Sequence, residues 1–230
     1  MNKKQITSII LNCIIFVLVF FATFCMVAGI ELMNDSPEIL AFTSSNLEAF
    51  KYFTVDSNVL AGLAALIFII FEVRLAKGKI SAIPKAIYAL KLAGTTGVTL
   101  TMLVTVFFLI PQFGKNWFIL FMNNNFFFHL IIPLLCIISF CFFESMGIYK
   151  LRISWLGTIP MIIYGIAYTI NIAAHLNGPK PLKDYDWYNF LNGNLANAFI
   201  SIPLMLIVTW LISLGLWAIN HYFTKKSNNK

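Results

Sequence analysis

Charged side chains are scarce in this sequence. Asp, Glu, Lys and Arg make up 11% of its 230 residues, whereas 60% are hydrophobic and the mean hydropathy is +0.84. A soluble domain of this length cannot bury so much apolar surface, so lipid must be the solvent for most of the chain. We therefore expect a single integral membrane domain over residues 1–230, without a separate soluble domain.

Cysteine is also sparse, and no pair has the CxxC spacing of a redox or zinc motif. The four cysteines all lie in apolar stretches: Cys13, Cys25, Cys136 and Cys141. We expect them to pack as small apolar side chains, with no disulfide framework, metal site or cofactor. The net charge is +7, but the basic residues form short clusters between apolar runs. That is the pattern of membrane topology signals, so nucleic acid is excluded as a partner.

Six apolar runs reach the length of about 20 residues that an α-helix needs to cross a bilayer. The predicted spans are 6–29, 50–74, 86–110, 126–146, 154–175 and 197–222. Irregular backbone cannot face lipid, so the predicted fold class is all-α, a polytopic membrane protein with six transmembrane helices. The stretch 112–124 is too short to cross, and we expect it to lie flat on the membrane surface as a partial lid.

Lysine and arginine concentrate in alternate connections between these spans. These residues are Lys3, Lys4, Arg74, Lys77, Lys79, Lys85, Lys150, Arg152, Lys225, Lys226 and Lys230. The other connections hold most of the acidic residues and few lysines. By the positive-inside rule both termini lie in the cytoplasm, which predicts a multi-pass protein of the cell membrane.

Two polar sites interrupt the apolar spans, at Thr54 in the second and at His129 in the fourth. At a rise of 1.5 Å per residue they lie about 30 Å and about 25 Å from the inner boundary, so both belong to the outer part of the bilayer. Polar groups in hydrocarbon are usually kept for function. Asp56 points away from Thr54 on a helix, so a Thr-His-Asp triad is not expected and a dyad remains.

A threonine and a histidine at one depth can carry out nucleophilic chemistry. Histidine has a pKa suited to taking the proton of a threonine hydroxyl, which then attacks the carbonyl of a lipid ester. Donors for the resulting oxyanion are available in Ser57 and Asn58, which share a helical face with Thr54, and in Asn125.

A further polar stripe runs along the fifth span at a spacing of four and three residues. It consists of Tyr164, Tyr168 and Asn171, followed by His175. Such a stripe either lines a substrate pocket or anchors the helix at the membrane interface, and both readings stay open. Thr95, Thr99, Thr101 and Thr105 of the third span lie beside glycines and are expected to serve close helix packing.

Two short motifs carry a family resemblance. Phe50-Lys51-Tyr52-Phe53-Thr54, together with Asn125, His129 and Pro133 at intervals of four residues, resembles the androgen-induced membrane hydrolase family. The likeness is to the bacterial six-helix relatives, which share the aromatic loop Tyr185-Asp-Trp-Tyr188. Animal members hydrolyse fatty acid esters of hydroxy fatty acids with an intramembrane threonine and histidine. The resemblance implies that Thr54 is the nucleophile, His129 the base, and a membrane lipid or fatty acyl ester the substrate.

Other classes of function remain open at this point. Lys91 and Asp56 could mark the pathway of a small-molecule or lipid transporter, or belong to a non-catalytic lipid-binding protein, although Lys91 could simply extend to the cytoplasmic interface. A bis-histidine haem site would use His129 and His175. A three-histidine zinc site is excluded because His221 lies at the opposite membrane face.

Overall fold

The fold of the chain comes from a computed structural model that describes residues 1–33, 46–144, 147–178, 180–182, 184–188 and 190–228. Within these residues six helical segments are long and apolar enough to cross a membrane: Lys3–Val27, Phe53–Ala76, Lys85–Phe121, Asn124–Phe143, Leu151–Ala174 and Leu195–Lys226. They coincide with the six predicted spans, so an all-helical, multi-pass membrane protein is confirmed. The last two residues predicted for the fourth span, 145–146, lie outside the described residues.

The segments are divided into elements by changes of helical pitch. In chain order they are α1 (Lys3–Val27), η1 (Leu47–Lys51), α3 (Phe53–Ala76), α4 (Lys85–Val104), η2 (Thr105–Leu109), α5 (Ile110–Phe113), η3 (Gly114–Phe121), α6 (Asn124–Phe126), η4 (Phe127–Ile131), α7 (Ile132–Ile138), η5 (Ser139–Phe143), η6 (Leu151–Thr158), α8 (Ile159–Ala174), β1 (Leu176–Asn177), β2 (Lys180–Pro181), η7 (Leu195–Asn197) and α9 (Ala198–Asn228). The two short strands pair antiparallel.

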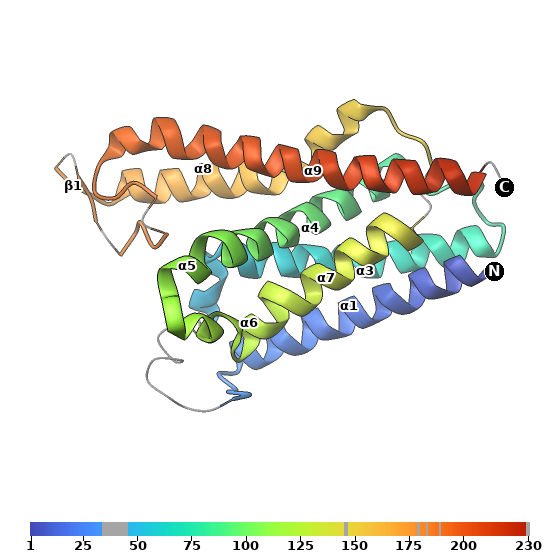
Figure 1. Ribbon diagram of the computed structural model, residues 1–230, viewed down its shortest axis with the longest axis horizontal. Helices are drawn as coiled ribbons and strands as arrows, with labels where there is room; N and C mark the ends of the chain where they lie inside the picture. Colours follow the sequence, from blue (N-terminus) through green and yellow to red (C-terminus); the bar gives the residue numbers. More distant parts are fainter. Residues whose placement is uncertain (34–45, 145–146, 179, 183, 189, 229–230) are drawn as a thin grey trace.

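Both chain termini lie at the same end of the bundle (Figure 1). We call this the terminal end, and the opposite end, where the β1–β2 hairpin and α5 lie, the distal end. At the distal end the third span does not stop at residue 110 as predicted. It continues through α5, and the chain then turns at Gly114, whose φ of +52° is a conformation that glycine adopts readily. The predicted surface stretch 112–124 thus becomes the 3₁₀ segment η3 followed by the start of α6.

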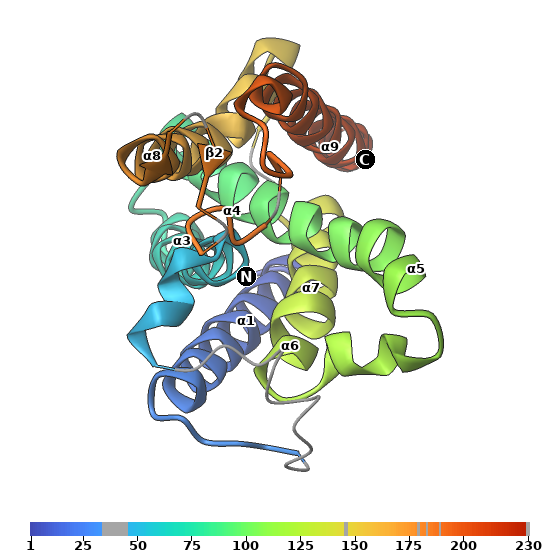
Figure 2. The same cartoon turned by 90° about the vertical axis from the view of Figure 1, so that its left-hand side faces the viewer.

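Helix α4 occupies the middle of the bundle, with α3, α7, α8 and α9 around it (Figure 2). Every residue from Lys91 to Thr101 is buried. Small residues allow α4 to pack closely against its neighbours: a Cβ added at Gly94 would lie 2.9 Å from the Cα of Ala61 on α3. Three threonines bond to their own helix as expected, with the hydroxyls of Thr99, Thr101 and Thr105 donating to carbonyls three or four residues earlier.

The contact at Gly94 gives a first prediction. We expect Gly94→Leu to lower the free energy of unfolding by about 2 kcal/mol or more, because the new side chain meets the backbone of α3 rather than a movable side chain. Gly215→Leu is the matched control, since a Cβ at Gly215 on α9 meets no atom within 4 Å. Thermal unfolding in detergent measures both variants. Equal melting temperatures for the two would contradict the close packing of α3 against α4.

Candidate active site

His129 lies in the π-helical turn η4, close to the distal end of the fourth span. Such turns widen a helix by one residue and are frequent at functional sites. The side chain is 9% exposed, and its Nδ1 lies 2.9 Å from the carbonyl oxygen of Leu120 in η3. Because a carbonyl can only accept, Nδ1 carries the proton in this bond, and the neutral ring then has its lone pair on Nε2. The segment expected to form a lid therefore orients this imidazole.

Thr54 lies in the first turn of α3 and is half-buried. One turn further along, the Asn58 amide donates to the carbonyl of Thr54 at 2.7 Å and to the carbonyl of Phe128 in η4 at 3.2 Å. The sequence left open whether the second and fourth spans touch, and this bond shows that they do. Thr54 and His129 therefore lie on two elements in direct contact, although no hydrogen bond joins the two side chains within the described residues.

Three polar neighbours of the dyad were considered as oxyanion donors. Both N–H groups of Asn58 are occupied by the two carbonyls, so Asn58 joins the helices and is not available as a donor. Ser57 donates its hydroxyl to the carbonyl of Thr54 at 3.1 Å and packs against Gly97 of α4. Asn125 lies in α6, one turn before His129, and is half-buried. Of the three, Asn125 is the one placed on the histidine's own helix.

The polar stripe of the fifth span lies on α8, away from His129. The Tyr164 hydroxyl donates to the carbonyl of Lys51 at 2.6 Å and accepts from the Trp187 indole at 3.1 Å. Tyr168 donates to the Asp186 carboxylate, and Asn171 accepts at its carbonyl from the His175 ring at 2.8 Å. Tyr164 and Tyr168 fasten the aromatic loop after α8 to the bundle, and their hydroxyl protons are already donated, so these two tyrosines are not proposed as substrate ligands. Asn171 bonds to His175 through its backbone carbonyl and not through its side chain.

The same loop also contacts the N-terminal end of α3. The Tyr188 hydroxyl accepts from the backbone N–H of Phe53 at 2.9 Å, and its ring packs edge-on against Tyr52. Burial, with the neighbouring Tyr164, raises the pKa of Tyr188 well above its ordinary value, so the phenol stays neutral. A neutral hydroxyl thus caps the N-terminal turn that carries Thr54.

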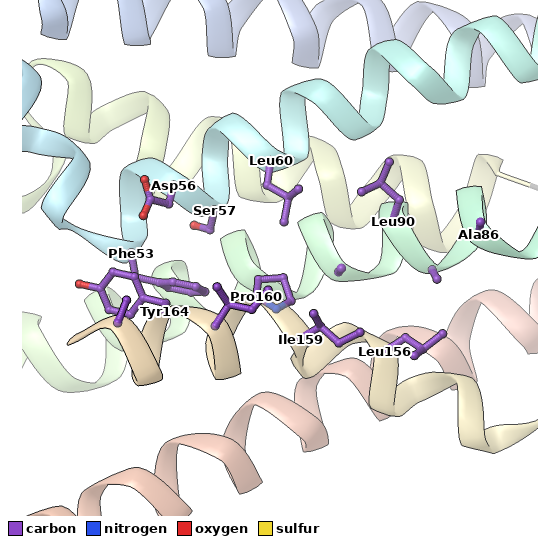
Figure 3. Close-up of a pocket in the computed structure, with 14 residues that line it drawn as sticks. Phe53, Asp56, Ser57, Leu60, Ala86, Leu90, Leu156, Ile159, Pro160 and Tyr164 are labelled. Carbon is purple, nitrogen blue, oxygen red and sulfur yellow. The ribbon is translucent and has the colours of Figure 1, made fainter. Parts of the chain in front are cut away.

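Asp56 lies on another side of α3. Together with Phe53, Ser57 and Tyr164 it lines one end of a cavity of about 680 Å³ between α3, α4 and α8 (Figure 3). Neither Thr54 nor His129 lines this cavity. The helical spacing had separated Asp56 from a catalytic triad, and the structure agrees with that separation.

Lys91 corrects a sequence-based expectation. It does not extend to the membrane interface: the residue is 1% exposed, and its ammonium lies 3.1 Å from the Glu144 carboxylate and donates to Asn12 at 2.7 Å. Lys91 stays inside the bundle because its two polar partners come from other parts of the chain. Glu144 follows η5 and Asn12 belongs to α1, so the charge is compensated inside the bundle.

A polar cluster surrounds this ion pair, and we call it the Lys91 cluster. Its remaining members are Ser8, Glu72, Ser139 and Asn220. Ser139 donates to Glu144 at 2.8 Å, and Ser8 donates to Glu72 at 2.7 Å. Sequence analysis missed these residues. The one available signal was Ser8 and Asn12, two polar residues at helical spacing in an otherwise apolar span.

The remaining histidines have local partners. His175 stacks on the Tyr185 ring, with the centroids 3.7 Å apart, and His221 lies beside Trp217. In the part of the chain that the structure describes, no group of three His, Cys, Asp or Glu side chains is placed to hold a metal ion.

Comparison with known proteins identified no family model, no curated protein and no solved structure that matches this chain.

Proposed function

We propose that this membrane protein hydrolyses lipid esters, with Thr54 as the nucleophile and His129 as the base. The observation that carries the proposal is the bond from His129 Nδ1 to the Leu120 carbonyl, on an element that Asn58 joins to the helix of Thr54. A base held by a second group, with its free nitrogen available to a hydroxyl on a neighbouring helix, is the arrangement of nucleophilic hydrolases. Here the Leu120 carbonyl orients the imidazole of His129, as a carboxylate orients the histidine of a Ser-His-Asp triad.

The reaction proceeds through an acyl-enzyme. Thr54 Oγ1 attacks the ester carbonyl while His129 Nε2 takes the hydroxyl proton, and the carbonyl oxygen becomes an oxyanion. When the tetrahedral intermediate collapses, the bond to the alkoxy oxygen breaks and His129 delivers the proton to the leaving alcohol. Water then attacks the acyl-threonine, again with His129 as the base. This step releases the fatty acid and regenerates Thr54.

The position of Thr54 in the first turn of α3 supports oxyanion stabilisation. The N-terminus of a helix has a positive potential from its aligned peptide dipoles, and this potential falls off within the first turn. In the tetrahedral intermediate the oxyanion lies two bonds from Thr54 Oγ1, on the carbon that Oγ1 has attacked, so the negative charge develops near that end of α3.

The proposal is tested with purified protein and long-chain fatty acyl esters of hydroxy fatty acids in detergent micelles. We expect wild type and Ser57→Ala to release fatty acid, and Thr54→Ala to release none above background. Ser57→Ala is the matched control, because it removes a hydroxyl one turn away that donates to the Thr54 carbonyl. Undiminished release by Thr54→Ala would refute the role of Thr54.

A transporter is the second candidate, and the Lys91 cluster favours it, because ionisable residues inside membrane spans often mark ion or substrate pathways. The two candidates differ in which residues matter. Transport predicts flux in proteoliposomes that Thr54→Ala retains and that neutralisation of Lys91 and Glu144 abolishes. Hydrolysis predicts the reverse for fatty acid release.

We also infer that the terminal end faces the cytoplasm, in the plasma membrane of a bacterium. The basic connections predicted to be cytoplasmic lie at the end of the bundle that holds both termini, which supports this orientation. Thr54 and His129 would then lie in the outer half of the bilayer, where lipid esters of the outer leaflet are within reach.

A further inference from the structure

An apolar groove runs along the bundle between α3, α4 and α8. Its volume is about 680 Å³, and its walls are almost entirely aliphatic or aromatic. Figure 3 shows its two ends: Phe53, Asp56 and Tyr164 lie together at one end, and Ala86 and Leu156 at the other. Leu156 in η6 and Ala167 in α8 are eleven positions apart, which corresponds to about 17 Å at the helical rise. The groove therefore has the length and surface that suit one fatty acyl chain.

One charged group stands at the end of this groove. Asp56 is the only charged residue among the described residues that line it. Within the described part of the chain its carboxylate has no ion pair, and no side chain or backbone group donates a hydrogen bond to it. A carboxylate at the edge of a hydrocarbon groove is costly unless a cation or a donor accompanies it. The described chain supplies neither, so a cation from outside the chain would stabilise this half-buried carboxylate.

The rings beside Asp56 indicate the charge of that partner. Phe53 and Tyr164 pack edge-on with centroids 5.2 Å apart, and Figure 3 shows them next to the carboxylate. The Tyr164 ring is held in place because its hydroxyl bonds to the Lys51 carbonyl. Aromatic faces and a carboxylate together attract an ammonium group, and they repel a phosphate or a carboxylate that has no cation.

From this geometry we infer that the groove is a binding site for a phospholipid with an ammonium headgroup. One acyl chain lies along α8 towards Leu156, and the headgroup ammonium pairs with Asp56 beside the two rings. The site is distinct from the proposed catalytic dyad, because neither Thr54 nor His129 lines the groove. The site gives the protein a preference for ammonium lipids over anionic lipids. The hydrolysis proposed above does not require this preference.

Native mass spectrometry tests the site on the full-length protein released from nanodiscs that contain equal amounts of phosphatidylethanolamine and phosphatidylglycerol. We expect wild type to retain phosphatidylethanolamine over phosphatidylglycerol by about threefold to tenfold. Asp56→Asn should bring this ratio close to one while lipid still binds. Ala89→Phe, which fills the groove, should reduce the retention of both lipids.

Two controls separate this site from general charge effects and from catalysis. Glu48→Gln removes an exposed carboxylate at the same end of the bundle and should leave the ratio unchanged. Thr54→Ala should also leave it unchanged, so the lipid site and the hydrolase can fail independently. Equal retention by wild type, or a preference that survives Asp56→Asn, would overturn the assignment. In nanodiscs where diacylglycerol, whose headgroup is a bare hydroxyl, replaces phosphatidylglycerol, equal retention of the two lipids would overturn the ammonium as the recognised group.

Discussion

Replacement of Lys91 by Met is expected to destabilise the protein by about 3–5 kcal/mol, because it leaves Glu144 as an unpaired charge in the bundle interior. Glu144 is 1% exposed, so water cannot take the place of the ammonium. Asn12 loses a donor at the same time, since its Oδ1 accepts from Lys91. The melting temperature in detergent and the yield of monodisperse protein measure the loss.

A double variant tests whether charge compensation is the cause. Lys91→Met with Glu144→Gln removes both charges, so it should recover most of the stability that the single change loses. Lys85→Met is the matched control, because Lys85 is exposed in the first turn of the same helix and should tolerate the change. If the double variant is as unstable as Lys91→Met alone, the packing of the lysine stem and not the ion pair holds the cluster together.

Replacement of His129 by Ala is expected to lower kcat/KM for ester hydrolysis by about 10²–10⁴-fold, the usual contribution of a positioned base. The loss should fall mainly on kcat, because the imidazole takes a proton in the transition state and binds little of the acyl chain. Initial rates of fatty acid release over a range of ester concentrations measure both parameters.

The control for this change is His175→Ala. His175 lies beyond the end of α8, where it stacks on Tyr185 and bonds to the backbone carbonyl of Asn171. Its replacement by Ala should leave kcat unchanged. A His129→Ala variant that is folded and keeps its kcat would remove His129 from the mechanism. A folded state is shown by an unchanged melting temperature, so loss of structure is not mistaken for loss of the base.

The six spans could be predicted from the sequence because a run of apolar residues must form a helix wherever it meets lipid. Their ends were less predictable. The third span continues to Phe113 through a π-helical turn at Thr105–Leu109, and Gly114 then permits the reversal. A π-helical turn does not alter hydropathy, so it has no signal in an apolar run.

For the candidate site, the sequence supplied the residue types and their depth but not their neighbours. Positive-inside counting predicted Thr54 and His129 at one level, whereas the contact between their helices is shown by the Asn58 bond to Phe128, which joins residues 70 positions apart. The failed expectation for Lys91 has the same origin. Extension to the interface is the cheapest state for a lysine on an isolated helix, but Glu144 lies 53 positions further along the chain.

Helix α3 connects the two proposals. One side of its first two turns carries Thr54 and Asn58, which belong to the contact with η4, and another carries Asp56, which belongs to the groove beside α8. Helical spacing produces this separation, because residues two apart point about 160° from each other. A single helix end can therefore serve a reaction on one side and lipid recognition on the other.

The most direct test of the central claim, that Thr54 is a nucleophile activated by His129, is to map the site of covalent labelling. A fluorophosphonate probe bonds to an activated hydroxyl and releases fluoride, and peptide mass spectrometry then locates the adduct. The account predicts an adduct on Thr54 in wild type and in Ser57→Ala, and none in Thr54→Ala or His129→Ala. An adduct on another residue, or labelling that survives Thr54→Ala, would contradict it.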